Sequence, residues 1–157
     1  MGRMYAACWT TGTINTGIDL FEFTAPADQV VVIHEIHMGV TAVASENLRV
    51  RLVRLLPTVT PGSGGSNATS SIGKLGGVKD PTPGSTLYTL NTTAATSSVA
   101  QQVIRRTVEN ALNGFHWVFT PESRIVVPSS GVIVAKLNDV PAGSFTMEGE
   151  IVFEEIG

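Results

Sequence analysis

The residues of this chain that could do chemistry are few, and His34-Glu35-Ile36-His37 is the first group to test. It resembles an incomplete zinc-protease motif, in which histidines at i and i+4 on a helix bring both imidazoles to one face. Here the spacing is i+3 within a run of β-branched residues, so the two rings are predicted to point to opposite faces of a strand. His116 is the only other histidine. We therefore expect no metal site.

No pattern for nucleophilic catalysis or phosphate binding is found in the sequence. There is no G-x-S-x-G nucleophile elbow, and the single cysteine, Cys8, has no local sign of activation. The Gly-rich stretch 62–77 resembles a phosphate-binding loop, but Ala68 stands where its first glycine belongs and Leu75 where Ser or Thr belongs. We predict a non-enzymatic protein without cofactors, in which the lone thiol is a small buried hydrophobe.

Composition narrows the classes of partner. The net charge is −3, so the chain has no electrostatic footprint for nucleic acid. Its longest clear apolar run is Val30–Ile33, far short of the about 20 residues that a transmembrane helix needs. The N-terminus lacks the apolar stretch of a secretory signal, so we expect folding in a cytoplasm without export. Only 15% of residues are charged, which indicates either a neutral β-rich surface or one covered by a partner.

The elements that must position these residues are predicted to be β-strands. From Gln101 to Ile156, short apolar runs alternate with turns rich in Asn, Gly, Pro and Ser. Asn113-Gly114 is a strong signal for a type I′ hairpin, in which both central residues have positive φ. The pattern predicts an all-β protein, an antiparallel β-sandwich or jelly-roll-like barrel, with residues 1–157 as a single domain.

The first half of the chain and one ambiguous segment complete the prediction. Strands are expected over Ile18–Thr24, Gln29–Met38 and Leu48–Leu56, with a further one at Ser85–Leu90. Val99–Leu112 fits a helix by its i+4 spacing and capping residues, but its β-branched residues favour a strand. We favour the strand.

Two segments are expected to lie outside the sandwich. One is an N-terminal arm of residues 1–9. The other is a Gly/Pro/Ser-rich loop, residues 57–84, within a stretch 57–100 that holds 7 of the 16 glycines and 4 of the 8 prolines. This loop is interpreted either as an exposed excursion that becomes ordered against a neighbouring subunit or as a plain mobile loop.

Charged residues cluster by sign. The arginines gather at Arg49, Arg51, Arg54, Arg105 and Arg106, and the glutamates crowd the last strand at Glu148, Glu150, Glu154 and Glu155. Opposite charges on neighbouring strands stabilise a sheet by roughly 0.2–1 kcal/mol per pair. Two interpretations stay open: cross-strand pairs within one subunit, or an arginine face of one subunit against a glutamate face of another.

Two aromatic residues are candidates for ligand stacking. Tyr88 and Trp117 could hold a sugar ring, because stacking aromatics beside polar groups are typical of carbohydrate sites. Trp117, within the run FHWVF, is also a natural core residue.

Three stretches carry a family resemblance: DLFEFTAPADQVVVIHEI (19–36), TPESRIVV (120–127) and GEIVFEEI (149–156). They resemble small β-rich structural proteins of tailed bacteriophages and prophages. The resemblance implies a virion protein made in the bacterial host cytoplasm, most simply a head-decoration (cement) protein that stabilises a capsid. Its partners would be itself, as a homo-oligomer such as a trimer, and the major capsid protein or another virion protein. The alternatives are a tail or baseplate attachment module that binds carbohydrate, and a self-assembling shell or filament subunit.

The residues expected to contact a partner come from the arm, the arginine cluster and the Gly-rich loop. They are Met1, Arg3, Tyr5, Trp9, Arg49, Arg51, Lys74 and Lys79.

Overall fold

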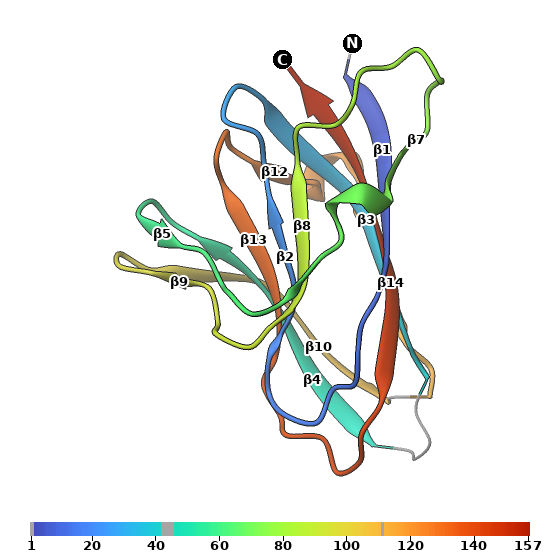
Figure 1. The fold of residues 1–157 in the computed structure, drawn as a ribbon, viewed down its shortest axis with the longest axis vertical. Helices are drawn as coiled ribbons and strands as arrows, with labels where there is room; N and C mark the ends of the chain where they lie inside the picture. Colours follow the sequence, from blue (N-terminus) through green and yellow to red (C-terminus); the bar gives the residue numbers. More distant parts are fainter. Residues whose placement is uncertain (1, 42–45, 111) are drawn as a thin grey trace.

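Two antiparallel β-sheets pack face to face (Figure 1). The computed structural model describes residues 2–41, 46–110 and 112–157. Sheet I contains, in spatial order, β11 (Phe115–Val118), β3 (Val30–Thr41), β14 (Thr146–Ile156), β1 (Arg3–Thr10) and β7 (Ile72–Lys74), and β12 (Ile125–Val127) also pairs with β3. Sheet II contains β10 (Gln101–Asn110), β4 (Asn47–Leu55), β13 (Val132–Leu137), β2 (Asp19–Thr24), β8 (Thr86–Asn91) and β6 (Ser66–Asn67).

The remaining elements are short. Strands β5 (Val59–Thr60) and β9 (Thr96–Ser97) form a two-stranded ribbon that projects to the left in Figure 1. Two 3-10 helices cover Thr69–Ser71 (η1) and Pro121–Ser123 (η2). Nowhere in the described ranges is a helix long and apolar enough to cross a membrane.

The strand order is that of a jelly roll. Taking β11 and β12 as one position, sheet I has the order β1-β14-β3-β11/β12, and sheet II has the order β2-β13-β4-β10. The chain reaches these positions in the sequence β1, β2, β3, β4, β10, β11/β12, β13, β14. This is the double Greek key of a jelly roll, so the predicted fold class is confirmed. The segment between β4 and β10 is an insertion that adds β7 to sheet I and β8 and β6 to sheet II.

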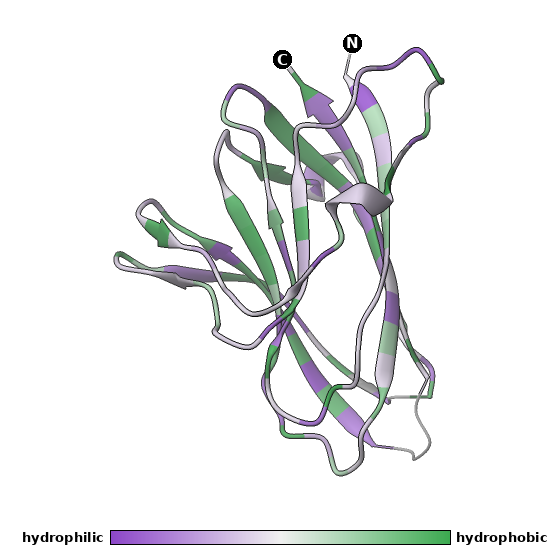
Figure 2. Cartoon of the chain, in the orientation of Figure 1, coloured by the Kyte–Doolittle hydropathy of each residue, from purple (hydrophilic) through white to green (hydrophobic). Residues whose placement is uncertain are grey.

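Residue alternation along the strands explains the sandwich. In β4, Leu48, Val50 and Leu52 point into the core, while Arg49 and Arg51 point outward, which is the period of two that a half-buried strand requires. Figure 2 shows this alternation as hydrophobic and hydrophilic bands along β4 and β14. Each sheet therefore turns an apolar face toward the other, and the sandwich forms because these two faces bury one another.

Sheet II also has a smaller apolar cluster on its outer face. It is formed by Val53, Leu55, Val132 and Val134 together with Ala95 of the insertion.

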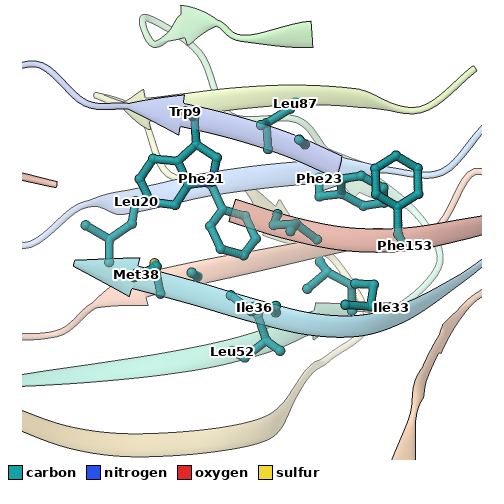
Figure 3. Close-up of a cluster of buried hydrophobic side chains, with 14 of the residues drawn as sticks. Trp9, Leu20, Phe21, Phe23, Ile33, Ile36, Met38, Leu52, Leu87 and Phe153 are labelled. Carbon is teal, nitrogen blue, oxygen red and sulfur yellow. The ribbon is translucent and has the colours of Figure 1, made fainter. Parts of the chain in front are cut away.

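Large aromatic side chains connect the two sheets in the core (Figure 3). The ring of Phe23 from sheet II meets the ring of Phe153 from sheet I edge-on, with centroids 4.9 Å apart. Trp9 and Phe21 form a second contact across the sheets, with centroids 5.8 Å apart. Such pairs contribute about 0.5–1.5 kcal/mol beyond the apolar area that they bury.

The N-terminal segment is strand β1, so the expected arm of residues 1–9 is wrong for the part that the structure describes. β1 pairs with β14 along its whole length and with β7 on its other side. Tyr5 and Trp9, expected to contact a partner, are buried with 0% and 4% of their surface exposed. Placing two large aromatic side chains in the core removes more apolar surface from water than a solvated arm would.

The insertion between β4 and β10 is held by bonds within the chain. Within the expected excursion 57–84, β6 pairs with β8 and β7 pairs with β1, so these two parts of it belong to the sheets. The buried carboxylate of Glu155 accepts hydrogen bonds from the backbone N–H of Gly84 at 3.0 Å and of Ser85 at 2.9 Å. On sheet II, the Asp19 carboxylate accepts one from Ala95 N–H at 2.7 Å, and the Lys136 ammonium lies 3.1 Å from Asp19 Oδ1.

These contacts also account for the buried acidic residues. A carboxylate is buried without a large penalty only when hydrogen bonds and opposite charge replace its water. The insertion supplies backbone N–H groups to Asp19, Glu22 and Glu155, and so covers each of them. Their role is to fix the insertion on the two sheets.

The segment before Asn113-Gly114 is a strand, as predicted, and the helical alternative for Val99–Leu112 is wrong. The turn itself differs from the expected type I′ hairpin, because Gly114 has φ +64° while Asn113 does not have positive φ. The turn leads from β10 in sheet II to β11 in sheet I, so it crosses between sheets instead of joining two paired strands. Gly114 fits there because its missing side chain lets it pass Met38, whose carbonyl oxygen would lie 2.6 Å from an added Cβ.

Candidate functional site

The three histidines lie on the same outer face of sheet I, although the sequence placed His34 and His37 on opposite faces. The pairing of β3 with β14 is irregular between Val152 and Phe153, and His34 is the extra residue on β3. Such a bulge breaks the strict alternation of side chains. His34 Nε2 consequently lies 3.4 Å from Glu154 Oε2 on that outer face.

A polar row crosses four strands of this face. Cys8 of β1 lies opposite Glu150 of β14, Glu150 lies opposite His37 of β3, and His37 lies opposite His116 of β11. The His37 and His116 rings meet edge-on with centroids 5.5 Å apart. His116 Nε2 also lies 3.2 Å from an oxygen of Glu35.

Two observations bear on the chemistry of this row. The Cys8 thiol is exposed, so its expected burial is wrong. Partial burial and the nearby Glu150 carboxylate raise the pKa of this thiol, which keeps it protonated and weakly nucleophilic. Within the part of the chain that the structure describes, no group of three or more His, Cys, Asp or Glu is placed to hold a metal ion.

We call Glu35, Glu148, Glu150 and Glu154 the acidic face. Glu35 and Glu154 each lie beside a histidine, whereas no described basic side chain forms an ion pair with Glu148 or Glu150. These last two line an open hollow of 380 Å³ together with Cys8 and His37. Gly39 forms its floor, and an added Cβ there would meet nothing within 4 Å.

The clustered arginines separate onto two sides of sheet II. Arg54 donates to the Val126 carbonyl oxygen at 2.8 Å, and Arg105 lies over the Phe119 ring, 5.5 Å from its centroid. Arg49, Arg51 and Arg106 point outward and line a hollow of 180 Å³, and we call these three residues the basic face.

The three arginines of the basic face differ in their partners. Arg49 Nε donates to the two oxygens of Asp139 at 2.8 and 2.9 Å, and these bonds lower the pKa of the Asp139 carboxyl. Arg51 and Arg106 lie directly opposite one another on β4 and β10. Of the side chains that the structure describes, none forms an ion pair with either.

The acidic and basic faces lie on opposite sides of the molecule. The two sheets pack with their apolar faces together, so the outer face of sheet I and the outer face of sheet II point away from each other. Arginine–glutamate pairing between neighbouring strands of one subunit, the first of the two interpretations of these charges, is therefore wrong. β14 is paired only with β1 and β3, neither of which carries these arginines.

The two candidate aromatic residues have different environments. Trp117 is partly buried against the core, with its ring 4.7 Å from that of Phe115. Tyr88 is 38% exposed on the outer face of sheet II, beside a hollow lined by the Gly-rich segment Pro61–Gly65.

Three of the remaining residues expected to contact a partner lie at the end of the sandwich that carries the chain termini. Arg3 is exposed at the start of β1, and Lys74 and Lys79 are exposed at and beyond the end of β7. Met1 lies outside the described residues. The sequence analysis identified most of the charged residues, but it did not predict which of them share a face. The bulge at His34 and the position of Arg51 opposite Arg106 depend on strand register, which local sequence does not report.

Comparison with known protein families, with curated proteins and with solved structures finds no match. The fold and the two charged faces are therefore the observations from which a function is argued.

Proposed function

We propose that this protein is a non-enzymatic structural subunit of a bacteriophage particle, and that copies join head to tail, basic face against acidic face. The observation that carries this proposal is the pair Arg51 and Arg106, which lie directly opposite one another on neighbouring strands. Neither forms an ion pair with a described carboxylate, although Asp139, which is paired with Arg49, is near enough to Arg51 for the two charges to attract. Like charges in that position repel each other and destabilise a sheet. An acidic surface from a second copy relieves this repulsion.

The dimensions of the two faces agree. Glu148 and Glu150 are two residues apart on one strand, which separates them by about 7 Å. Arg51 and Arg106 are cross-strand neighbours, with Cα atoms about 5 Å apart. The long arginine side chains can span this difference and enter the hollow above Gly39.

Each charged face also includes an apolar residue that could be buried in the contact. Val108 is exposed beside Arg49 on the basic face, and Val40 lines the acidic hollow. This matters because exposed ion pairs contribute only about 0–1 kcal/mol each, and charge gives orientation and specificity more than affinity.

The placement of the faces bears on the kind of assembly. A contact between two different surfaces of the same subunit gives a ring if its rotation closes and an open filament if it does not. Faces on opposite sides of a sandwich favour propagation in one direction. This favours a shell or filament subunit over a small closed trimer.

The assignment to a phage particle is supported by the resemblance of three stretches to phage structural proteins. The jelly roll agrees with it, because viral capsid domains use this architecture, as do lectins and cupins. Fold likeness is an analogy and does not by itself define a function.

Head decoration is the second candidate, and the loop 75–80 favours it. Val78 has 95% of its surface exposed, and Leu75 is also exposed in this loop. Lys74 and Lys79 flank them. Exposed apolar residues within a polar rim are typical of a contact surface, so this end of the sandwich would sit on the capsid lattice.

The proposal is tested with two charge-reversed variants, R51E/R106E and E148R/E150R, by native mass spectrometry and light scattering. We expect the unmodified protein to assemble at low salt and to dissociate at high salt, because salt screens exposed charges. Each variant alone should remain monomeric, since its two faces then carry like charge. An equimolar mixture should assemble again in alternation, because each variant supplies the face that the other lacks.

The double variant K74E/K79E is the matched control, since it changes the net charge by the same amount as R51E/R106E and lies outside both faces. Its assembly should equal that of the unmodified protein. Assembly of R51E/R106E alone, or failure of the mixture to assemble, would refute the head-to-tail contact. A protein that is monomeric at every salt concentration would leave head decoration as the better candidate.

A further inference from the structure

A second hollow lies on the outer face of sheet II, away from both charged faces. It has a volume of 490 Å³ and lies between the strands β2 and β8 and the loop Pro61–Gly65. Its strand side has two cross-strand rows, Glu22 opposite Tyr88 and Thr24 opposite Thr86. The volume is within the range of small-molecule sites, about 300–1,000 Å³.

Two buried polar side chains, Glu22 and Asn91, line this hollow. Glu22 has 3% of its surface exposed, and its Oε2 accepts hydrogen bonds from Gly62 N–H at 2.9 Å and from Asn91 Nδ2 at 2.6 Å. Asn91 is 2% exposed, and its Oδ1 has no hydrogen-bond partner among the described residues. A buried acceptor without a donor is rare in proteins, so the Asn91 Oδ1 atom has an unused capacity to accept a hydrogen bond.

Asn91 reaches the hollow because side-chain alternation along β8 breaks at Leu90. Leu90 has φ +54°, a left-handed conformation that bulky residues rarely adopt. With regular alternation from the outward-facing Tyr88, Leu90 would point outward and Asn91 inward. Instead Leu90 packs against the core and Asn91 reaches Glu22 on the outer face. Strained backbone of this kind occurs preferentially at functional sites.

The glycines of the loop are required by the same arrangement. An added Cβ on Gly62 would lie 2.2 Å from Asn91 Nδ2, and one on Gly65 would lie 2.5 Å from the Thr89 carbonyl oxygen. Only glycine lets the loop pass so close above the Asn91 amide. The low-complexity stretch therefore has a specific structural role as the second wall of the hollow.

We propose that this hollow binds a sugar residue, with one face of the sugar ring against Tyr88 and its hydroxyls toward Glu22, Asn91 and the two threonines. A sugar ring has an apolar C–H face and a polar rim, and an exposed tyrosine ring beside carboxylate, amide and hydroxyl groups matches both. The Glu22 carboxyl, whose pKa is raised mainly by burial, can hydrogen-bond with sugar hydroxyls. The site shares no residue with the charged faces.

The test is saturation-transfer NMR with a panel of glucose, galactose, mannose, rhamnose and N-acetylglucosamine, followed by titration with any sugar that binds. The variant Tyr88→Ala should abolish the transfer, whereas Tyr88→Phe, which keeps the ring, should retain most of it. Thr86→Val keeps the shape of the side chain and removes a hydroxyl, so it should weaken binding. Val140→Ala, another exposed apolar position outside this hollow, is the matched control and should bind as the unmodified protein does.

Two results would overturn the proposal: no transfer to any sugar of the panel, or binding by Tyr88→Ala equal to that of the unmodified protein. Thermal melting of each variant shows whether it is folded. If Tyr88→Ala does not fold, loss of sugar binding by Thr86→Val tests the site instead. Because the charge-reversed variant R51E/R106E leaves this hollow intact, it should still bind the sugar. Failure of the assembly proposal and failure of the sugar site are thus distinguishable.

Discussion

Truncation of Tyr5 is the sharpest test of whether the N-terminal segment is a core strand or a free arm. The Tyr5 side chain is fully buried, its ring lies 5.5 Å from that of Phe153, and its hydroxyl donates to the Pro81 carbonyl oxygen at 3.1 Å. Replacing a buried aromatic residue by alanine costs about 3–5 kcal/mol through lost burial and the cavity left behind. Removing only the hydroxyl, as in Tyr5→Phe, costs about 1 kcal/mol.

These magnitudes translate into a measurable shift in urea unfolding. With a slope of about 2 kcal/mol per molar urea, Tyr5→Phe should lower the midpoint by about 0.5 M and Tyr5→Ala by about 2 M. Fluorescence of the buried Trp9 reports the transition. Cys8→Ala, at an exposed position of the same strand, is the matched control and should shift the midpoint little.

An equal effect of Tyr5→Ala and Cys8→Ala would refute the reasoning, because it would mean that burial of Tyr5 contributes nothing to the free energy of unfolding. The same experiment separates a stability role from a binding role. A free arm would lose partner binding at unchanged stability, whereas a core strand loses stability before anything else.

Three further outcomes are expected from the same unfolding assay. Gly114→Ala should destabilise the protein by more than about 1 kcal/mol, because φ is +64° and the added Cβ meets the Met38 carbonyl oxygen, whereas Gly77→Ala, with open space around it, should be neutral. Burial raises the pKa of the Glu22 carboxyl above its ordinary value of 4.5. The favourable contribution of this carboxyl to the free energy of unfolding is therefore complete below pH 4.5 and is lost as the pH rises through the raised pKa. Glu22→Gln should therefore gain stability relative to the unmodified protein as pH rises from 4.5 to neutral, and a constant difference would contradict this. Lys136→Met should cost about 3 kcal/mol because it leaves a buried aspartate without its cation, while the same change at the exposed Lys79 should cost almost nothing.

The local pattern of the sequence determined the fold class. Strand periodicity depends only on which residues alternate, so Leu48, Val50 and Leu52 against Arg49 and Arg51 identify a half-buried strand without any tertiary knowledge. The same reasoning settled β10, where β-branched residues outweighed a plausible helix cap.

Polarity and glycine content were weaker guides to where a segment lies. The Gly-rich insertion is exposed over much of its length, yet it is fastened to the sheets by the buried carboxylates Asp19, Glu22 and Glu155. These bonds join residues that are far apart in the chain, and no local pattern reports them. For the same reason, the mixed polar and aromatic run at the N-terminus suggested an arm, although it forms a strand that is paired with β14 along its whole length.

The sequence by itself determined which residues carry charge and which strands alternate; the tertiary structure decided which of them meet. A single bulge at His34 brought the histidines to one face, and one left-handed residue at Leu90 turned Asn91 toward Glu22. Both are one-residue departures from regular alternation, and each inverts the side of the sheet on which a polar group appears. The separation of Arg51 and Arg106 from Glu148 and Glu150 likewise follows from strand order, because a jelly roll assigns β4 and β14 to different sheets whose outer faces point apart.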